Sequence, residues 1–165
     1  MNPLYLEKIR SFLQEIGIPL QFTDEPCDSF LKGIKIVNGA LRVNTNDLLC
    51  TGDILHEAGH LACLPSDLRS KASGDLTEAV GADNAFEMTA ILWSVAAAHH
   101  LNIPLSEIFH PHAYRGDSDW LKEQMVAGNY IGLPLLQWIR LAASDEEVRA
   151  ENAPPFPALK RWLRV

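Results

Sequence analysis

Two histidines and a glutamate stand close together in one short stretch of the chain, His56-Glu57-Ala58-Gly59-His60. Histidines four residues apart project from the same face of a helix, so His56 and His60 can each offer a ring nitrogen to one ion. Zinc accepts neutral imidazole nitrogens and is usually bound by four ligands. Glu57 leaves the helix on a neighbouring face, from which it can reach a water near the ion without being a ligand. The pattern therefore predicts a zinc site with a general base beside it.

The residues around this motif favour a helix. Thr51 or Asp53 is expected to cap its start, and Pro65 marks its end. Gly59 is a poor helix former, so its presence indicates that the backbone of another element packs closely at this position. In the alternative interpretation, both histidines are ordinary half-buried helix residues and Glu57 is solvated. The pattern can also arise by chance, but its apolar surroundings favour the metal site.

A catalytic zinc site usually has three protein ligands and one open position, so a third ligand must come from elsewhere in the chain. Glu87 stands among apolar residues of a long predicted helix, and burying a carboxylate there is costly unless it is paired or binds a metal. We therefore expect Glu87 to be the third ligand, with a buried ion pair or access to solvent as the alternative. The other downstream candidates are Glu78, Asp83, His99 and His100.

These other candidates have simpler explanations. Glu78 is in the first turn of the predicted helix, where the helix dipole favours a carboxylate, and His99 and His100 are near its end, where the dipole favours a cation. Asp83 is one turn before Glu87 and could accept the free N–H of a ligand histidine.

A polar loop after the long helix contains side chains that could stabilise a negatively charged oxygen in a transition state. Tyr114, His110 and His112 cluster there and can donate hydrogen bonds. We expect Tyr114 or His110 to act as the catalytic donor that complements Glu57. A surface loop without a role in chemistry is an equally good interpretation.

Two local patterns precede the motif. Asn2-Pro3 can open a helix in which apolar residues recur at helical spacing from Tyr5 to Ile16, and Gly17 and Pro19 end it. Residues 18–32 are expected to be irregular. Asn38-Gly39 then joins two β-branched runs, which is a strong signal for a hairpin. We expect this hairpin to lie near the site and to offer an edge to an extended substrate.

The remaining pattern predicts a mostly helical α+β domain. A helix from about Leu76 to Leu101 is apolar on nearly every side and should be central. Asp117 or Ser118 is expected to cap a further helix, and Pro134 opens another that runs to Leu141. Composition places one compact domain at residues 1–150, followed by a Pro-rich linker and short tail at residues 151–165.

Composition narrows the class of protein. The chain has 165 residues, of which 47% are hydrophobic, so one domain with a real core is expected. A formal net charge of −7 argues against nucleic acid as a partner, because phosphate binding needs a basic surface. Three cysteines without C-x-x-C spacing do not indicate a disulfide framework.

Residues 1–8 do not resemble a signal peptide, and the most apolar run is too short to span a bilayer. We expect a cytoplasmic protein that does not contact a membrane; these features leave its oligomeric state undetermined.

The motif His56-Glu57-x-x-His60, followed by a helical glutamate, resembles the gluzincin branch of zinc metallopeptidases. The hairpin before the motif and Glu87 in the next long helix are most similar to compact ImmA/IrrE-type metallopeptidases. The likeness covers roughly residues 33–100 and extends to uncharacterised bacterial proteins with H-E-A-G-H and E-M-x-A-I arrangements. It implies a zincin-like fold, zinc bound by His56, His60 and Glu87, Glu57 as the base, and a peptide or protein substrate. The chain departs from the pattern at Ile91, where gluzincins often have aspartate.

Two other classes of function are compatible with the sequence. One is a metal-binding sensor or protein-interaction module without catalysis, in which Trp120, Trp138 and Trp162 of the apolar C-terminal half could contact a partner. The other is a helical adaptor that binds no metal. Metal content after purification without added zinc separates the adaptor from the metal-binding classes. The activity of Glu57→Gln against wild type separates the enzyme from the non-catalytic module.

Overall fold

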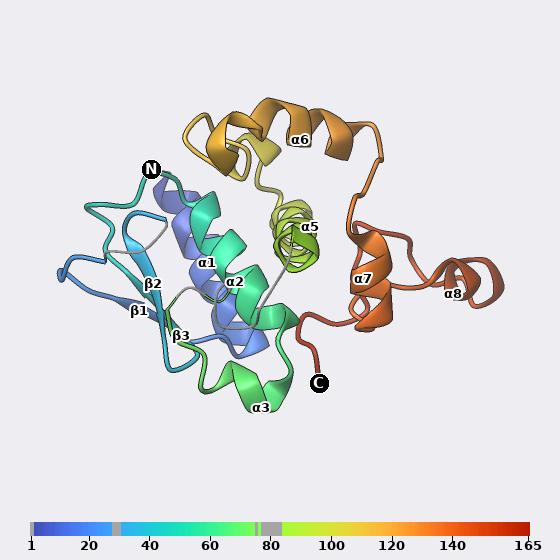
Figure 1. Cartoon of the computed structure of the whole chain (residues 1–165), viewed down its shortest axis with the longest axis horizontal. Helices are drawn as coiled ribbons and strands as arrows, with labels where there is room; N and C mark the ends of the chain where they lie inside the picture. Colours follow the sequence, from blue (N-terminus) through green and yellow to red (C-terminus); the bar gives the residue numbers. More distant parts are fainter. Residues whose placement is uncertain (1, 28–30, 75, 77–83) are drawn as a thin grey trace.

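A computed structural model describes residues 2–27, 31–74, 76 and 84–165 of the chain. The described helices and strands, in chain order, are α1 (Pro3–Ile16), β1 (Leu20–Phe22), β2 (Ile34–Val37), β3 (Ala40–Val43), α2 (Gly52–Cys63), α3 (Ser66–Arg69), α5 (Asn84–Leu101), the 3₁₀ turns η1 (Leu105–Glu107) and η2 (Tyr114–Gly116), α6 (Ser118–Val126), α7 (Leu133–Trp138) and α8 (Asp145–Ala150). The predicted α+β class, with more helix than strand, is confirmed. The small sheet lies on one side of α1 and α2, whereas α6, α7 and α8 lie on the side of α5 (Figure 1).

The first helix and the hairpin form where local sequence signals place them. The Asn2 side chain accepts a hydrogen bond at the start of α1, and Gly17 ends the helix with a φ of 83°. β2 and β3 pair antiparallel, with Ile36 opposite Leu41. The connecting Asn38 and Gly39 have φ values of 49° and 73°, which are left-handed conformations that asparagine and glycine tolerate.

The stretch before the hairpin differs from the expectation of irregular structure. Leu20–Phe22 forms β1, which pairs parallel with β3 and gives the strand order β1-β3-β2. A three-residue strand has too little alternation to be recognised alone, and its partner is distant in sequence. Because β3 is central, only β2 could offer the hairpin edge predicted for a substrate. There the Ile36 carbonyl already accepts a hydrogen bond from the Gly74 amide at 3.0 Å.

The core of the molecule is the crossing of α2 and α5, which pack more extensively on each other than any other pair of described elements. The long predicted helix is described from Asn84, and the part expected at residues 77–83 lies outside the described residues. Trp93 of α5 is completely buried, and Ala90 through Ala98 form a continuous buried run. This confirms that the helix is central and explains why no polar face could be found in its sequence.

The predicted helix starts and ends beyond α5 need small corrections. Asp117 is the N-cap of α6 but makes no side-chain capping bond, and the Ser118 hydroxyl instead donates to the carbonyls of His110 and Ala113. α7 ends at Trp138, earlier than predicted, because Arg140 adopts a left-handed φ of 62° that a helix cannot continue.

The C-terminal residues, expected from composition to be a linker and tail, contact the core. Trp93 Nε1 donates to the Trp162 carbonyl at 2.9 Å, and the Arg164 amide donates to the Ala62 carbonyl at 2.9 Å. The Arg69 guanidinium of α3 also donates to the Arg164 carbonyl. These bonds hold the last residues against α2 and α5. In the described part of the chain, none of the helices has the length and apolar character needed to cross a membrane.

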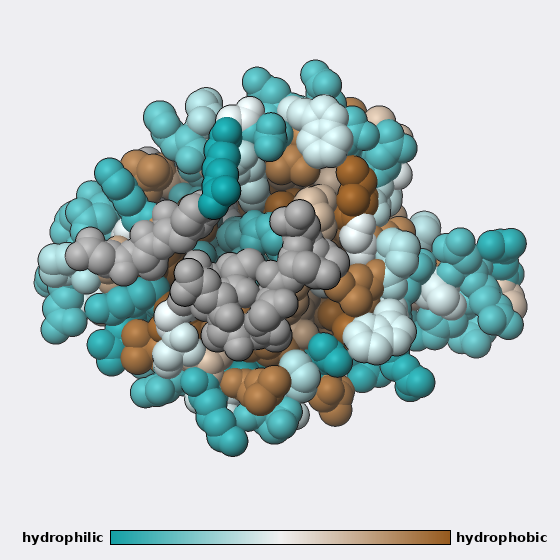
Figure 2. Space-filling model, in the orientation of Figure 1, coloured by the Kyte–Doolittle hydropathy of each residue, from teal (hydrophilic) through white to brown (hydrophobic). Residues whose placement is uncertain are grey.

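The region around α8 is less buried than the core. α8 projects away from the rest of the chain (Figure 1), and Figure 2 shows it covered with hydrophilic residues. None of its residues is buried. A capping box holds its start: the Ser144 hydroxyl accepts from the Glu147 amide, and the Glu147 carboxylate accepts from the Ser144 amide. The acidic stretch that begins at Asp145 is therefore part of a capped helix start.

Candidate metal centre and catalytic site

The motif forms in the most deeply packed helix of the molecule. Eleven residues of α2 are buried, including His56 and His60, which are 6% and 5% exposed. A Cβ atom at Gly59 would lie 2.6 Å from the Ala90 carbonyl oxygen of α5. The prediction that another backbone packs closely at Gly59 is confirmed, and this contact sets the distance between the two helices.

The start of α2 is held differently from the prediction. Thr51 occupies the N-cap position without a side-chain capping bond, and its hydroxyl donates to the Glu107 carboxylate at 2.6 Å. Asp53 does not cap the helix either, because its carboxylate contacts His110. Gly52 is needed because a Cβ atom there would overlap the Glu107 carbonyl oxygen at 1.9 Å. These contacts fix the start of α2 against η1.

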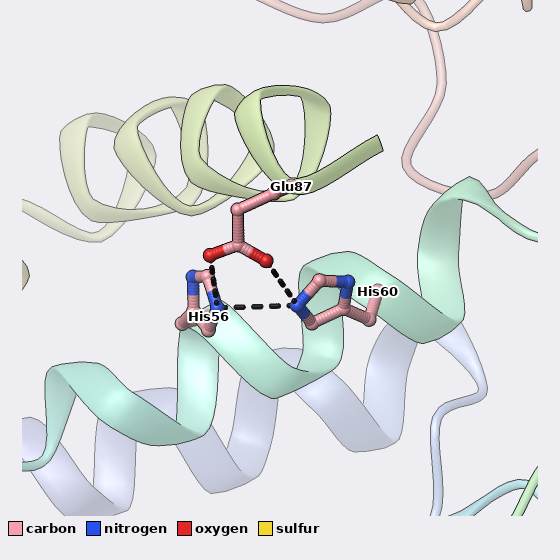
Figure 3. Close-up of side chains that lie close together, drawn as sticks. All are labelled: His56, His60 and Glu87. Carbon is pink, nitrogen blue, oxygen red and sulfur yellow. Dashed lines mark hydrogen bonds and ion pairs between the residues drawn. The ribbon is translucent and has the colours of Figure 1, made fainter. Parts of the chain in front are cut away.

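The two histidines meet Glu87 across the helix crossing. His56 Nε2 lies 3.3 Å from Glu87 Oε1, and His60 Nε2 lies 3.2 Å from Glu87 Oε2. The two Nε2 atoms are 3.1 Å apart. Figure 3 shows both rings rising from α2 toward the carboxylate that descends from α5. The structure thus brings together the three residues that the sequence predicted as ligands, and they form a group able to hold a metal ion.

The dimensions of this triangle suit zinc. With bonds of about 2.0–2.1 Å, two ligands at a tetrahedral angle are separated by about 3.3 Å. The three donor separations of 3.1, 3.3 and 3.2 Å are close to that value. Two imidazole nitrogens and one carboxylate oxygen are also a common ligand set of catalytic zinc, and this set leaves one position open. The residues present therefore fit the ion.

Glu87 differs in one respect from the expectation of full burial. Its side chain remains 35% exposed, so the cost of burying this carboxylate is smaller than the sequence argument assumed. Burial raises its pKa, but hydrogen bonds and charge interactions with His56 and His60 outweigh that effect and hold the pKa below its usual range. Glu87 is consequently an anion at neutral pH, placed at an opening to solvent.

Glu57 differs from the rest of α2 in its exposure. It is the one residue of α2 that is not buried, and it follows His56 directly, so its side chain leaves the helix about 100° away from the ligand direction. The carboxylate is close enough to Tyr114 to help raise the pKa of that hydroxyl. A carboxylate beside the ligands with access to solvent can reach both a water molecule and a substrate.

Tyr114 lies beside the site, but on the outer side of His56. Its hydroxyl is 3.4 Å from His56 Nδ1, whereas Nε2 is the ring nitrogen that pairs with Glu87. The two rings meet edge to face with centroids 5.6 Å apart. Burial raises the pKa of the Tyr114 hydroxyl, and Glu87, Asp53 and Glu57 raise it further, so the phenol stays protonated. This contact favours a positioning role over the oxyanion-donor role that the sequence suggested.

His110 is likewise close to the motif helix without facing the ligands. Its Nε2 lies 2.8 Å from Asp53 Oδ1, and both residues are buried. That nitrogen is therefore occupied by Asp53 and is not directed at a transition state. Asp53 is a functional candidate that sequence reasoning considered only as a helix cap. The available signal was an acidic residue one turn before the first motif histidine, on the apolar side of the helix.

The remaining candidates are placed outside the centre or outside the described residues. His99 and His100 are exposed at the end of α5, as expected, and His100 packs its ring against Phe12 and Trp162. Glu78 and Asp83 lie outside the described residues, so the role suggested for Asp83 stays a prediction. His60 Nδ1 is buried without a hydrogen-bond partner among the residues that the structure describes. The ring of His60 packs against Phe86, with centroids 5.3 Å apart.

A comparison of the chain with protein-family models, curated proteins and solved structures returns no match.

Proposed function

We propose that this chain is a zinc-dependent metallopeptidase of the gluzincin type, with His56, His60 and Glu87 as zinc ligands and Glu57 as general base. The observation that carries the proposal is the ligand triangle at a helix crossing, with separations of 3.1 to 3.3 Å. Glu57 supports it further, because it is the only α2 residue that is not buried and it stands next to a ligand.

Each residue has a distinct task in the proposed reaction. His56 and His60 hold the ion through Nε2, and Glu87 contributes a negative charge that balances part of the charge of the ion. Zinc, when bound, lowers the pKa of a coordinated water to about 7 and polarises the scissile carbonyl. Glu57 takes a proton from the attacking water and then gives it to the leaving amine. We expect the substrate to approach from the side on which the Glu87 side chain is partly exposed.

Substrate class and compartment are part of the proposal. A peptide or protein is the proposed substrate, on the basis of the motif and its third ligand; neither nucleic acid nor membrane is proposed as a partner. The acidic balance of the chain, with a formal net charge of −7, supports the first exclusion. Cys27, Cys50 and Cys63 are all free thiols, which fits a reducing compartment such as the cytoplasm.

The test pairs zinc content with turnover in wild type and Glu57→Gln. Gln keeps the size of the side chain but cannot accept the proton, so hydrolysis of a broad peptide library should fall by about 10²- to 10⁴-fold. Zinc stoichiometry, measured by elemental analysis, should stay at one per chain in both proteins. Glu146→Gln, which changes an exposed glutamate on α8, is the matched control and should leave both quantities unchanged.

Other outcomes point elsewhere. Zinc in both proteins with no cleavage by wild type of any peptide or protein tested would favour the non-catalytic sensor or interaction module. Equal cleavage by wild type and Glu57→Gln would show that another group is the base, or that a contaminating peptidase causes the cleavage. Wild-type protein that binds no zinc would remove the proposed mechanism altogether.

A further inference from the structure

The loop between η1 and α6 touches the motif helix at two places close to His56. The Tyr114 hydroxyl lies 3.4 Å from His56 Nδ1. His110, four residues earlier in the loop, contacts Asp53, three residues before His56, at 2.8 Å. One loop and one turn of helix are thus joined next to His56, through atoms other than the Nε2 that pairs with Glu87.

The backbone of this loop is held in an unusual conformation. Tyr114 and Arg115 have φ values of 52° and 54°, which residues with a Cβ atom seldom adopt. Such a conformation persists only where the surroundings enforce it. Here the Ser118 hydroxyl donates to the carbonyls of His110 and Ala113 at 2.8 and 3.0 Å. The same local bonds therefore fix the direction in which the Tyr114 ring leaves the loop.

Asp53 and His110 supply the second attachment. Asp53 is 4% exposed and His110 is 8% exposed, so their contact is shielded from water. Buried polar groups that pair with each other define a position more strictly than apolar packing does, because any displacement leaves a polar group without a partner. The pair fixes the distance between the loop and the start of α2.

The contact between Tyr114 and His56 bears on which ring nitrogen of His56 carries the proton. A ligand histidine that presents the lone pair of Nε2 to an ion carries its proton on Nδ1. The Nδ1–H of His56 then donates to the Tyr114 hydroxyl oxygen. Outer hydrogen bonds of this kind orient ligand histidines, and their loss typically lowers metal affinity about 10- to 100-fold.

We propose that Tyr114 is a positioning residue that holds His56 in the tautomer and orientation needed for metal binding, and that the Asp53–His110 pair holds Tyr114 in place. The inference rests on the metal site of the proposed function but is independent of peptide hydrolysis. It assigns Tyr114 a hydrogen bond to a ligand, in place of a contact with the substrate.

The test measures metal affinity in Tyr114→Phe, which removes only the hydroxyl. Dissociation constants for Zn²⁺ are measured by competition with a chromogenic chelator, and visible spectra are recorded for the Co²⁺-loaded proteins. We expect zinc to bind about 10- to 100-fold more weakly than in wild type, with shifted Co²⁺ absorption bands. Tyr130→Phe removes a hydroxyl from a ring that packs on Phe156, and should change neither the affinity nor the spectrum.

A double-mutant cycle tests the role of the second attachment. Asp53→Asn should weaken zinc binding when Tyr114 is present and have little further effect in the Tyr114→Phe background, because it acts through the tyrosine. Circular dichroism of the metal-free proteins verifies that each variant is folded. An additive effect of the two substitutions would overturn the role assigned to the Asp53–His110 pair.

Two results would overturn the role of Tyr114. One is Tyr114→Phe with wild-type affinity and an unchanged Co²⁺ spectrum, while His56→Ala loses the metal; the proposed metallopeptidase would then still stand. The other is wild-type protein that binds neither metal, which would remove both proposals together. Wild-type protein that binds zinc but cleaves nothing would refute only the peptidase, and the affinities would still decide the inference about Tyr114.

Discussion

The α2–α5 crossing and the α8 region contain similar residue types in opposite surroundings. Both have a glutamate whose pKa is held below its usual range: Glu87 by His56 and His60 against the effect of burial, and Glu147 chiefly by hydrogen bonds from Lys160 and the Ser144 amide. All but one residue of α2 are buried, whereas none of α8 is. At α8 the polar contacts only organise a helix end. At the crossing each polar group must be satisfied in a largely apolar setting, so their concentration indicates a site.

A lowered pKa does not identify function by itself. The Glu147 carboxylate accepts hydrogen bonds from Lys160 and from the Ser144 amide of the capping box, and these bonds explain its lowered pKa without any ligand. Glu87 has two buried imidazole partners on another helix, in a geometry that matches one ion.

Loss of a tryptophan should have very different effects in α5 and in α7. Trp93 of α5 is fully buried and donates to the Trp162 carbonyl, while Trp138 at the end of α7 is 72% exposed. Trp93→Ala should lower the free energy of unfolding by about 3–5 kcal/mol, and Trp138→Ala should change it by less than about 0.5 kcal/mol. Urea titration followed by circular dichroism measures both. Similar losses from the two variants would show that the core is not centred on the crossing.

The two glutamates should differ in their effect on zinc-dependent stability. Zinc that binds only the folded chain at 100 times its dissociation constant should stabilise it by about 2.7 kcal/mol. Glu87→Gln should lose most of this gain, because it removes an anionic ligand from the group with His56 and His60. Glu147→Gln should retain it. Thermal melts with zinc and with a chelator provide the measurement; an equal zinc response in Glu87→Gln and wild type would move the third ligand elsewhere.

Gly59 allows a direct test of the helix crossing. Alanine is the better helix former by about 1 kcal/mol, so Gly59→Ala would stabilise an uncrowded helix. Here the added Cβ atom would lie 2.6 Å from the Ala90 carbonyl oxygen, and overpacking of this kind typically costs about 1–3 kcal/mol. We expect a net loss of stability in chemical denaturation, together with weaker zinc binding as the helices separate. Increased stability would contradict the close approach of α2 and α5.

The smallest effect is expected at the capping box of α8. Ser144→Ala removes the hydroxyl that accepts from the Glu147 amide at 3.2 Å, which should cost about 0.5–1 kcal/mol. Because α8 buries no residue, the loss should appear as faster hydrogen exchange within residues 145–150, with zinc affinity unchanged. A change in zinc affinity would show that α8 and the metal centre are coupled, and would contradict this expectation.

Local sequence determined the motif helix and much of its setting. The spacing of His56 and His60 places both rings on one face by helical geometry alone, and Glu57 is set apart from them by the same geometry. Asn38-Gly39 specified the hairpin turn because few other residues tolerate two successive left-handed conformations. Gly59 indicated the close helix crossing, because a residue that weakens a helix needs a compensating contact.

The prediction of Glu87 rested on its apolar neighbours and not on spacing. The sequence suggested that a carboxylate among apolar residues needs a partner, and the choice of residue agrees with the structure. The actual partner and the remaining 35% exposure of the side chain follow from how α5 crosses α2. A sequence pattern indicates which residues are neighbours along one helix. The exposure of a side chain depends on which other elements pack against that helix.

Only the tertiary structure decided the features that join distant parts of the chain. β1 pairs with β3 across about twenty residues, Tyr114 reaches His56, and Asp53 meets His110. Each contact depends on the relative placement of elements, which is set by packing of the whole core and not by any local preference. The sequence could therefore name the groups able to do chemistry at the motif, but the partners that orient them arise from the fold as a whole.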